Sequence, residues 1–210
     1  MRIWTLLFTL FLCATPLAAQ NELPASWKIR FDEPATAESL LFYVEMPPGW
    51  HVTTGPAAIL YDPEWRTSGR YRVATEVFIF PGEHREGFGI FVGGQGLTRT
   101  HPSYLDFQIR GDGYYRIEQR ENGHIRSLAP WMAHSSIVKQ EGSDGTAKNA
   151  LAIEVESAQL TFYVNGDSLT TLPNDGMSVE GTVGFRIDRD VNVHVTDLMI
   201  ERRFGPRRMP

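Results

Sequence analysis

Two short segments of the sequence, 104–109 and 114–120, alternate polar and apolar side chains in a pattern that could support chemistry. Their polar members include Tyr104, Asp106, Gln108, Arg116, Glu118 and Arg120. A carboxylate can transfer a proton or attack as a nucleophile. Carboxylate, amide and guanidinium groups together can also hold pairs of ligand hydroxyls through charge-assisted hydrogen bonds. Either chemistry requires a fold that brings the two segments side by side.

The two segments predict a β-hairpin. Side chains of a strand point to alternate faces, so the apolar residues Phe107 and Ile117 mark a buried face and the polar residues share the other. A three-residue loop, Gly111-Asp112-Gly113, is the connection that satisfies the pattern of both strands. The predicted register pairs Asp106 with Glu118, Gln108 with Arg116, and Tyr104 with Arg120.

The pair Asp106 and Glu118 has two interpretations. Directly opposed residues lie about 5 Å apart at Cβ, which suits the carboxylate pair of a retaining glycosidase. Arg116 and Arg120 are their diagonal neighbours, so the same residues also fit a charge-balanced surface ladder without chemistry. Both interpretations stay open at this point.

Other groups of reactive residues are weaker. Glu154 and Glu156 share one face of a strand, which an outward polar face explains. The run 188–192, DRDVN, imitates the start of a calcium-binding loop, but valine and methionine occupy its sixth and twelfth positions, which excludes an EF-hand. A looser calcium site remains an alternative. The histidines are scattered without metal-ligand spacing, so we predict no metal site and no cofactor.

The stretch 159–202 predicts the fold. Apolar residues alternate along three runs, and Asn165-Gly166 between two of them is typical of a two-residue type I′ hairpin turn. The apolar parity switches near Thr196-Asp197, which predicts one extra residue there as a β-bulge. Strands recurring every 8 to 12 residues indicate an all-β sandwich of two antiparallel sheets. The predicted core includes Phe107, Ile117, Phe162, Val183 and Phe185.

Length and composition indicate one exported domain. Residues 1–20 read as a secretory signal peptide, which leaves a β-sandwich domain over 21–203 and a basic tail over 204–210. The one cysteine, Cys13, lies within the signal, so the mature chain is expected to form no disulfide. The formal net charge of −5 argues against a nucleic-acid partner. We predict a secreted or periplasmic protein with no membrane-spanning segment once the signal is removed.

The order of motifs resembles the concanavalin A-like lectin/glucanase superfamily, and within it the secreted domains grouped as 3-keto-disaccharide hydrolase-like. The segments that carry the resemblance are FGIFVGG (88–94), YLDFQI (104–109), NALAIEV (149–155), LTFYVNG (160–166), GTVGFRI (181–187) and VHVTDLMIE (193–201). The resemblance implies a jelly-roll sandwich that binds its ligand on the concave sheet face or its rim. The Asn-Ser-Gly and Trp-Asn elements of hydrolase-type members are replaced here by Glu86-Gly87-Phe88-Gly89 and Lys148-Asn149, and the E-x-D-x-x-E motif of the glucanases is absent.

Taken with the resemblance, the hairpin predicts a non-catalytic lectin-like domain that binds a glycan or glycoside. A sugar offers hydroxyl pairs to charged groups and an apolar face to an aromatic ring. The expected ligand-binding residues are Tyr104, Asp106, Gln108, Arg116, Glu118, Arg120 and Trp131, with Tyr104 or Trp131 stacking. Two alternatives remain, an enzyme that acts on oxidised glycosides and a structural or protein-interaction module of the cell envelope.

Overall fold

The computed structural model describes residues 23–33, 41–82, 85–142 and 145–203. The predicted signal peptide and the basic tail lie outside these ranges. The described residues form fifteen β-strands and no helix. Within them there is no helix of the length and apolarity needed to cross a membrane.

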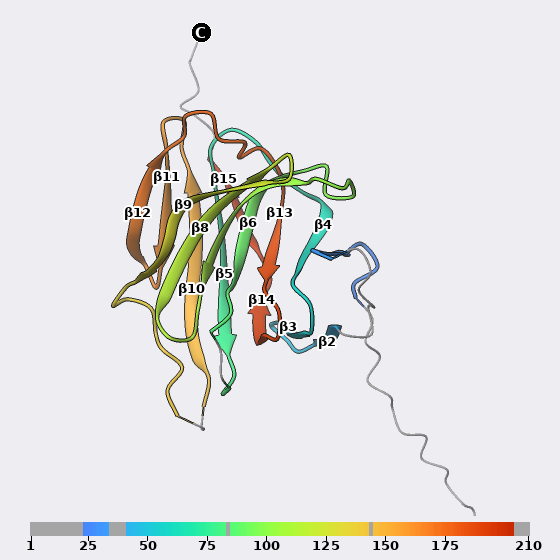
Figure 1. The fold of residues 1–210 in the computed structure, drawn as a ribbon, viewed down its shortest axis with the longest axis vertical. Helices are drawn as coiled ribbons and strands as arrows, with labels where there is room; N and C mark the ends of the chain where they lie inside the picture. The colour runs from blue at the N-terminus through green and yellow to red at the C-terminus, as the bar shows by residue number, and fades with distance from the viewer. Residues whose placement is uncertain (1–22, 34–40, 83–84, 143–144, 204–210) are drawn as a thin grey trace, which may run out of the picture.

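The strands form two antiparallel sheets that pack face to face, as Figure 1 shows. The seven-stranded sheet has the order β1 (Lys28–Phe31), β4 (Ala58–Thr67), β13 (Gly181–Ile187), β6 (Phe88–Gln95), β7 (Ser103–Ile109), β8 (Tyr114–Glu121) and β9 (His124–Ala133). The eight-stranded sheet has the order β12 (Asp167–Pro173), β11 (Gln159–Val164), β10 (Ala147–Val155), β5 (Tyr71–Ile79), β14 (Asn192–Thr196), β3 (Gly49–Thr54) and β2 (Leu41–Glu45), and β15 (Met199–Arg202) also pairs with β5. The predicted sandwich is therefore confirmed.

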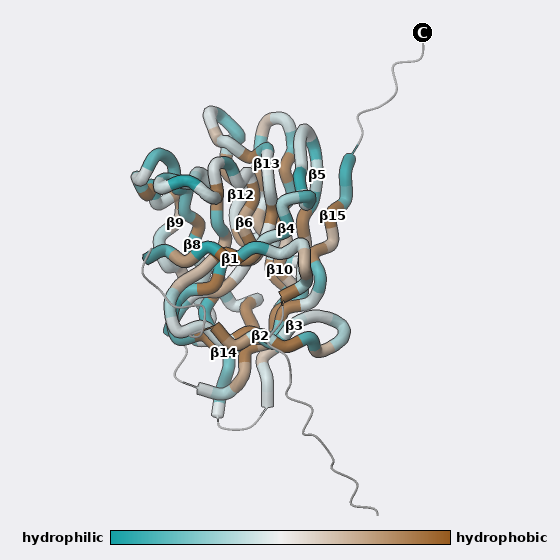
Figure 2. Tube along the Cα trace, turned by 90° about the vertical axis from the view of Figure 1, so that its right-hand side faces the viewer, coloured by the Kyte–Doolittle hydropathy of each residue, from teal (hydrophilic) through white to brown (hydrophobic). Residues whose placement is uncertain are grey.

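Alternating apolar residues of both sheets form the core between them. The five predicted core residues are all buried, each at most 1% exposed. The rings of Phe107 on β7 and Phe162 on β11 meet edge to face across the sheets, with centroids 5.5 Å apart. In Figure 2 the hydrophilic residues gather in the turns and the hydrophobic ones lie along the strands. Burial of one strand face thus holds the two sheets together.

Both local features predicted for the C-terminal stretch are present. Asn165 and Gly166 have φ values of 51° and 88°, as a type I′ turn requires, and they join β11 to β12. The register of β14 and then β15 against β5 shifts by one residue across 196–198, which is the expected extra residue. The Thr196 hydroxyl accepts a hydrogen bond from the Glu76 backbone N–H at 2.9 Å. This bond satisfies a backbone donor of β5 at the point where the bulge interrupts the strand pairing.

The core assignment predicts an unequal effect of two phenylalanine truncations. Replacing the fully buried Phe162 with alanine removes its contact with Phe107 and leaves a cavity, so the free energy of unfolding should fall by about 3–5 kcal/mol. Phe42→Ala is the matched control because Phe42 is 46% exposed, and its effect should stay within about 1 kcal/mol. Urea denaturation measures both, and equal losses would contradict the core assignment.

Candidate functional site

The polar residues of the β7–β8 hairpin lie on the outer face of the seven-stranded sheet, opposite the core. Their pairing is the predicted one: Asp106 lies opposite Glu118, Gln108 opposite Arg116, and Tyr104 opposite Arg120. The backbone N–H of Arg110 donates to the carbonyl of Tyr114 at 2.8 Å, which closes the three-residue loop. Alternation along both strands therefore predicted the register correctly.

The order of strands in the sheet brings Arg186, a residue distant in the sequence, next to the hairpin. On the outer face Arg116 is followed across the sheet by Gln108, Gly89 and then Arg186 of β13. Since glycine has no side chain, nothing on β6 separates Arg186 from Gln108. The guanidinium of Arg186 thus joins the polar side chains of the hairpin.

Arg186 is held by two carboxylates. Asp32, which follows β1, accepts two hydrogen bonds from its guanidinium at 2.7 and 2.8 Å. Asp188, at the end of β13, accepts a third at 3.0 Å. The second oxygen of Asp188 lies 3.2 Å from Nη2 of Arg116, so Asp188 connects β13 to the hairpin.

The ion pairs continue along β8. Arg116 pairs with Glu118 at 3.6 Å and also donates to the side-chain oxygen of Gln108. Arg120 pairs with Glu118 and with Asp106, both at 3.3 Å. We call this set the arginine–carboxylate network, and its members are Asp32, Asp106, Gln108, Arg116, Glu118, Arg120, Arg186 and Asp188.

The network has a buried layer and a partly exposed layer. Asp106 and Gln108 are fully buried, and Arg186 is 2% exposed. The side chains of Arg116 and Glu118 are 18% and 13% exposed. Within the hairpin two carboxylates face two arginines, as one of the two interpretations supposed, but these side chains do not form a solvent-exposed ladder.

Four buried polar atoms of the network have no hydrogen-bond partner among the described residues. They are Oδ1 of Asp106, Nε2 of Gln108, Nε of Arg116 and Nε of Arg186. Each such group costs about 1–3 kcal/mol. Buried polar atoms left unpartnered are uncommon in folded proteins, and their concentration in one place is a property of functional sites.

Burial changes the proton affinity of the Asp106 carboxyl. Desolvation raises its pKa to about 6, although the guanidinium groups of Arg186, Arg120 and Arg116 act in the opposite direction. Desolvation likewise raises the pKa of the Tyr104 hydroxyl to about 12, so this hydroxyl is a donor at neutral pH. The network thus holds a carboxyl that changes charge within the physiological range.

The two predicted aromatic residues differ in their access to a ligand. The Tyr104 ring is 3% exposed and packs against Phe91 with centroids 5.3 Å apart, so its hydroxyl and not its face is available. Trp131 is partly buried on β9, and the guanidinium carbons of Arg110 and Arg116 lie 4.6 and 4.7 Å from its ring centroid. The Trp131 ring is thus more accessible than that of Tyr104, but two guanidinium groups lie over it.

A bulge and a glycine place Trp131 over the network. The register of β8 and β9 shifts between Tyr115 and Ile117, which leaves both Pro130 and Trp131 opposite Arg116. Bulges re-aim side chains in this way at sheet edges, where proline is also tolerated. A Cβ at Gly87 would come within 2.9 Å of the Trp131 ring and 3.0 Å of Gln108 Nε2. Only glycine leaves room for this arrangement.

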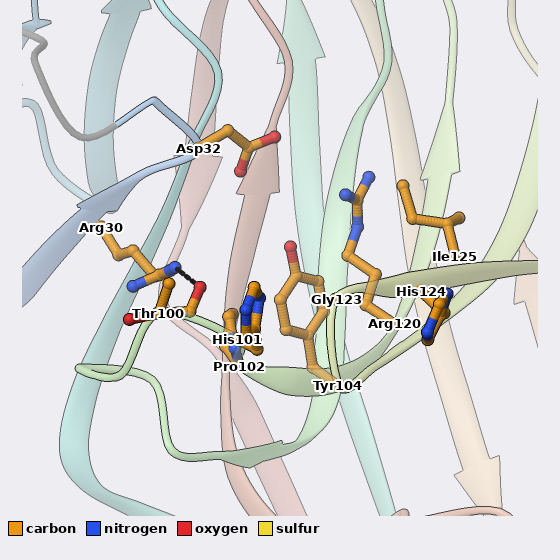
Figure 3. Close-up of a pocket in the computed structure, with 10 residues that line it drawn as sticks. All are labelled: Arg30, Asp32, Thr100, His101, Pro102, Tyr104, Arg120, Gly123, His124 and Ile125. Atoms are coloured by element: carbon orange, nitrogen blue, oxygen red, sulfur yellow. Dashed lines mark hydrogen bonds between the residues drawn. The ribbon is translucent and has the colours of Figure 1, made fainter.

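A pocket of about 220 Å³ opens beside the network. Figure 3 shows the Tyr104 ring standing between His101 and Arg120, with its hydroxyl directed to the side where Asp32 lies. Arg30 and the turn at Gly123 complete the walls. The pocket shares Asp32 and Arg120 with the network.

Sequence reasoning missed Asp32 and Arg186, and it read Asp188 as a possible calcium ligand. A lone arginine in the otherwise apolar GTVGFRI segment was a signal for Arg186, whereas nothing local marked Asp32. Both oxygens of Asp188 face guanidinium groups, which removes the first ligand of the calcium interpretation. No group of three metal-ligating side chains occurs within the described ranges.

Comparison with known proteins identifies the fold. No protein-family model matches the sequence, and no curated protein matches it either. Among solved structures, the carbohydrate-binding module CBM66 from Bacillus subtilis is similar with a TM-score of 0.62 at 11% identity, over 84% of this chain and 96% of that one. A Bacillus subtilis protein of unknown function with a galectin-like fold is similar with a TM-score of 0.61 at 13% identity, over 84% and 90%.

A third similar structure is the GH16 protein of the Bacteroides ovatus mixed-linkage glucan PUL, in complex with the G4G4G3G product. Its TM-score is 0.57 at 7% identity, over 83% of this chain and 94% of that one. At these identities the comparisons establish the fold alone. The predicted jelly-roll sandwich of two antiparallel sheets is confirmed.

Burial of Asp106 predicts a pH dependence of stability. Its carboxyl has an ordinary pKa of 3.8 and a folded-state pKa of about 6, so between these values the folded state binds the extra proton. The contribution of Asp106 to the free energy of unfolding is therefore greatest below about pH 4 and falls by about 3 kcal/mol as the pH rises to about 7.

Asp106→Asn removes this titration while keeping the shape of the side chain. Urea denaturation of both proteins from about pH 4 to about pH 7 isolates the effect, because contributions of other groups cancel in the difference. The stability of the wild type relative to Asp106→Asn should decline with rising pH. A difference that stays constant would show that Asp106 titrates normally.

Proposed function

We propose that this protein binds a carbohydrate on the outer face of the seven-stranded sheet, over the arginine–carboxylate network. The observation that carries the proposal is the set of unpartnered polar atoms in this network. Three of them are donors, on Gln108, Arg116 and Arg186, and one is an acceptor, on Asp106. A ligand rich in groups that both accept and donate hydrogen bonds is the chemical complement of this set, and sugar hydroxyls are such groups.

Further features support a sugar. Trp131 places an aromatic wall beside the charged groups, as the apolar face of a pyranose requires, with the guanidinium of Arg116 over its ring. The fold is shared with a protein described as a carbohydrate-binding module and with a GH16 protein in complex with a glucan product. Carbohydrate binding outside the cytoplasm also agrees with the secretory signal predicted over residues 1–20.

The partly exposed and the buried side chains of the network have different roles in the proposed binding. Arg116, Glu118 and Arg120 are partly exposed and form the surface on which hydroxyls are held. Asp106 and Gln108 lie beneath them and orient the guanidinium groups, and their unpartnered atoms receive ligand groups that enter the network. Because the ion pairs fix these side chains before binding, little conformational entropy is lost when the ligand arrives.

A glycan array followed by calorimetry tests the proposal. Removing a charged contact should weaken binding by about 1.5–3 kcal/mol, or roughly tenfold to a hundredfold. Arg116→Ala and Asp106→Ala are expected to show this loss. Lys148→Ala removes a charge that is 52% exposed on the other sheet and should bind as the wild type does.

Folding of each variant is checked by circular dichroism. Because Asp106 is buried, Arg116→Gln serves as a milder second variant. Unchanged affinity in the Arg116 and Asp106 variants would place the site elsewhere, and affinity for a protein partner without any glycan would favour an envelope interaction module.

A glycoside-acting enzyme is the second candidate, because Asp106 and Glu118 form an opposed carboxylate pair and the pKa of Asp106 is raised to about 6. Two carboxylates in unlike environments are the arrangement used by acid and base or nucleophile in glycosidases. The resemblance to 3-keto-disaccharide hydrolase-like domains makes 3-keto-glycosides the first substrates to try.

Turnover of 3-keto-glycosides and ordinary glycosides, with and without added metal ions, tests this second candidate. The binding proposal expects no turnover. If turnover occurs and is lost in both Asp106→Asn and Glu118→Gln, the protein is an enzyme and the non-catalytic proposal is wrong.

A further inference from the structure

The pocket beside the network is lined by more basic than acidic side chains. Its walls come from the end of β1, the 100–102 segment before β7, and the turn between β8 and β9. Two guanidinium groups, two imidazoles and one carboxylate line it, together with the 56% exposed side chain of Ile125. Figure 3 shows these residues around a common space. Basic groups thus outnumber acidic ones in the pocket.

Arg30 is a cation of the pocket that forms no ion pair among the described residues. Its guanidinium donates to the backbone carbonyls of Leu97 at 3.2 Å and Thr100 at 3.1 Å. No carboxylate forms an ion pair with it within the described part of the chain. Two of its five N–H donors are therefore used to fix its position, and the rest are free for a ligand.

The single carboxylate of the pocket does not compensate Arg30. Asp32 is already engaged by the guanidinium of Arg186 through two hydrogen bonds, at 2.7 and 2.8 Å. That pairing lowers the pKa of the Asp32 carboxyl against the opposing effect of desolvation, so Asp32 stays ionised. Its hydrogen bonds thus go to the buried Arg186 and not to Arg30.

Arg120 contributes a second available donor. Its Nε and Nη2 atoms bond Asp106 and Glu118, and its Nη1 atom makes no hydrogen bond to any described residue. The Tyr104 hydroxyl, which lies between Arg120 and His101, stays protonated at neutral pH and adds another donor. The pocket thus presents convergent donors that are fixed in place by the fold.

We propose that this pocket binds the carboxylate of an acidic sugar residue, a uronic acid at the end of a glycan chain, with Arg30 as its principal partner. The inference rests on the proposed carbohydrate-binding function and specifies its ligand class. A guanidinium is the group best matched to a carboxylate because its planar N–H donors engage both oxygens. At about 220 Å³ the pocket is smaller than the roughly 300 Å³ of the smallest drug-sized sites, which suits one sugar residue.

Calorimetry with a matched pair of probes tests this proposal. Oligogalacturonate and its methyl ester share one backbone and differ in the charge of the carboxyl groups. The wild type should bind the acid at least about tenfold more tightly than the ester, and the preference should shrink in high salt because a charge pair is screened. An oligosaccharide whose only charged groups are sulfate esters is the third probe and should bind less tightly than the acid.

Three variants assign the preference to Arg30. Arg30→Gln should bind acid and ester alike, while Arg30→Lys keeps the charge and should retain part of the preference. Arg203→Gln is the matched control, because Arg203 pairs with Glu154 on β10 of the other sheet, and it should behave as the wild type. Thermal unfolding confirms that each variant is folded.

The outcomes separate this inference from the function on which it rests. Binding of neutral glycans with no preference for the acid, or a preference that persists in Arg30→Gln, would overturn the uronate assignment and leave carbohydrate binding intact. Preference for the sulfated probe over the uronate would overturn the choice of carboxylate. Failure to bind any glycan would overturn both.

Discussion

A guanidinium buried in a β-sheet needs carboxylates beside it to neutralise its charge. On the outer face of the seven-stranded sheet this guanidinium is that of Arg186, and the other polar side chains are arranged around it. It is 2% exposed, and Asp32 and Asp188 hold it through three hydrogen bonds. Removing one partner of a buried ion pair commonly costs about 3–5 kcal/mol, so this cluster couples the edge strand β1 to the centre of the sheet. From Arg186 the charges alternate in sign through Asp188, Arg116, Glu118 and Arg120 to Asp106. Four carboxylates thus stand against three guanidinium groups, and the terminal, fully buried Asp106 is the one whose pKa is raised to about 6.

The hairpin could be read from the sequence and the rest of the network could not. Alternation along β7 and β8, with a glycine-rich loop between them, determines their register, because a slip of one residue would turn every side chain to the wrong face. Arg186 and Asp32 reach the same face through strand order, which depends on pairings between residues far apart in the chain. Trp131 was among the expected ligand-binding residues, but its placement depends on a bulge beside Pro130 in a strand that the sequence did not suggest. Similarly, the polar face predicted for the hairpin gave no sign that Asp106 and Gln108 would be withdrawn from water.

The burial of the ion-paired side chains favours the proposed ligand binding because it fixes their positions in advance. Side chains that are ion-paired on a sheet lose little freedom when a ligand binds, and the sheet supplies the rigidity that a surface loop would lack. The four unpartnered atoms lower the stability of this rigid network. A network arranged for stability alone would have given each of them a hydrogen-bond partner. The pocket at Arg30 extends the same face, so the proposed hydroxyl-binding groups and the proposed site for a charged chain end lie on one surface.

The central claim is that a ligand engages the donors of the network. Nitrogen–proton correlation spectra resolve the side-chain Nε–H groups of arginines and the amide of Gln108. They therefore report on Arg116, Arg186 and Gln108, whose nitrogen atoms lack partners among the described residues. Titration of the labelled protein with a glycan that binds should shift the Nε–H signal of Arg116 and the Gln108 amide, while Arg70 and Arg203, whose partners Glu154 and Glu156 lie on or beside β10 of the other sheet, stay unchanged. Shifts confined to the other sheet, with Arg116 and Gln108 unaffected, would contradict this account.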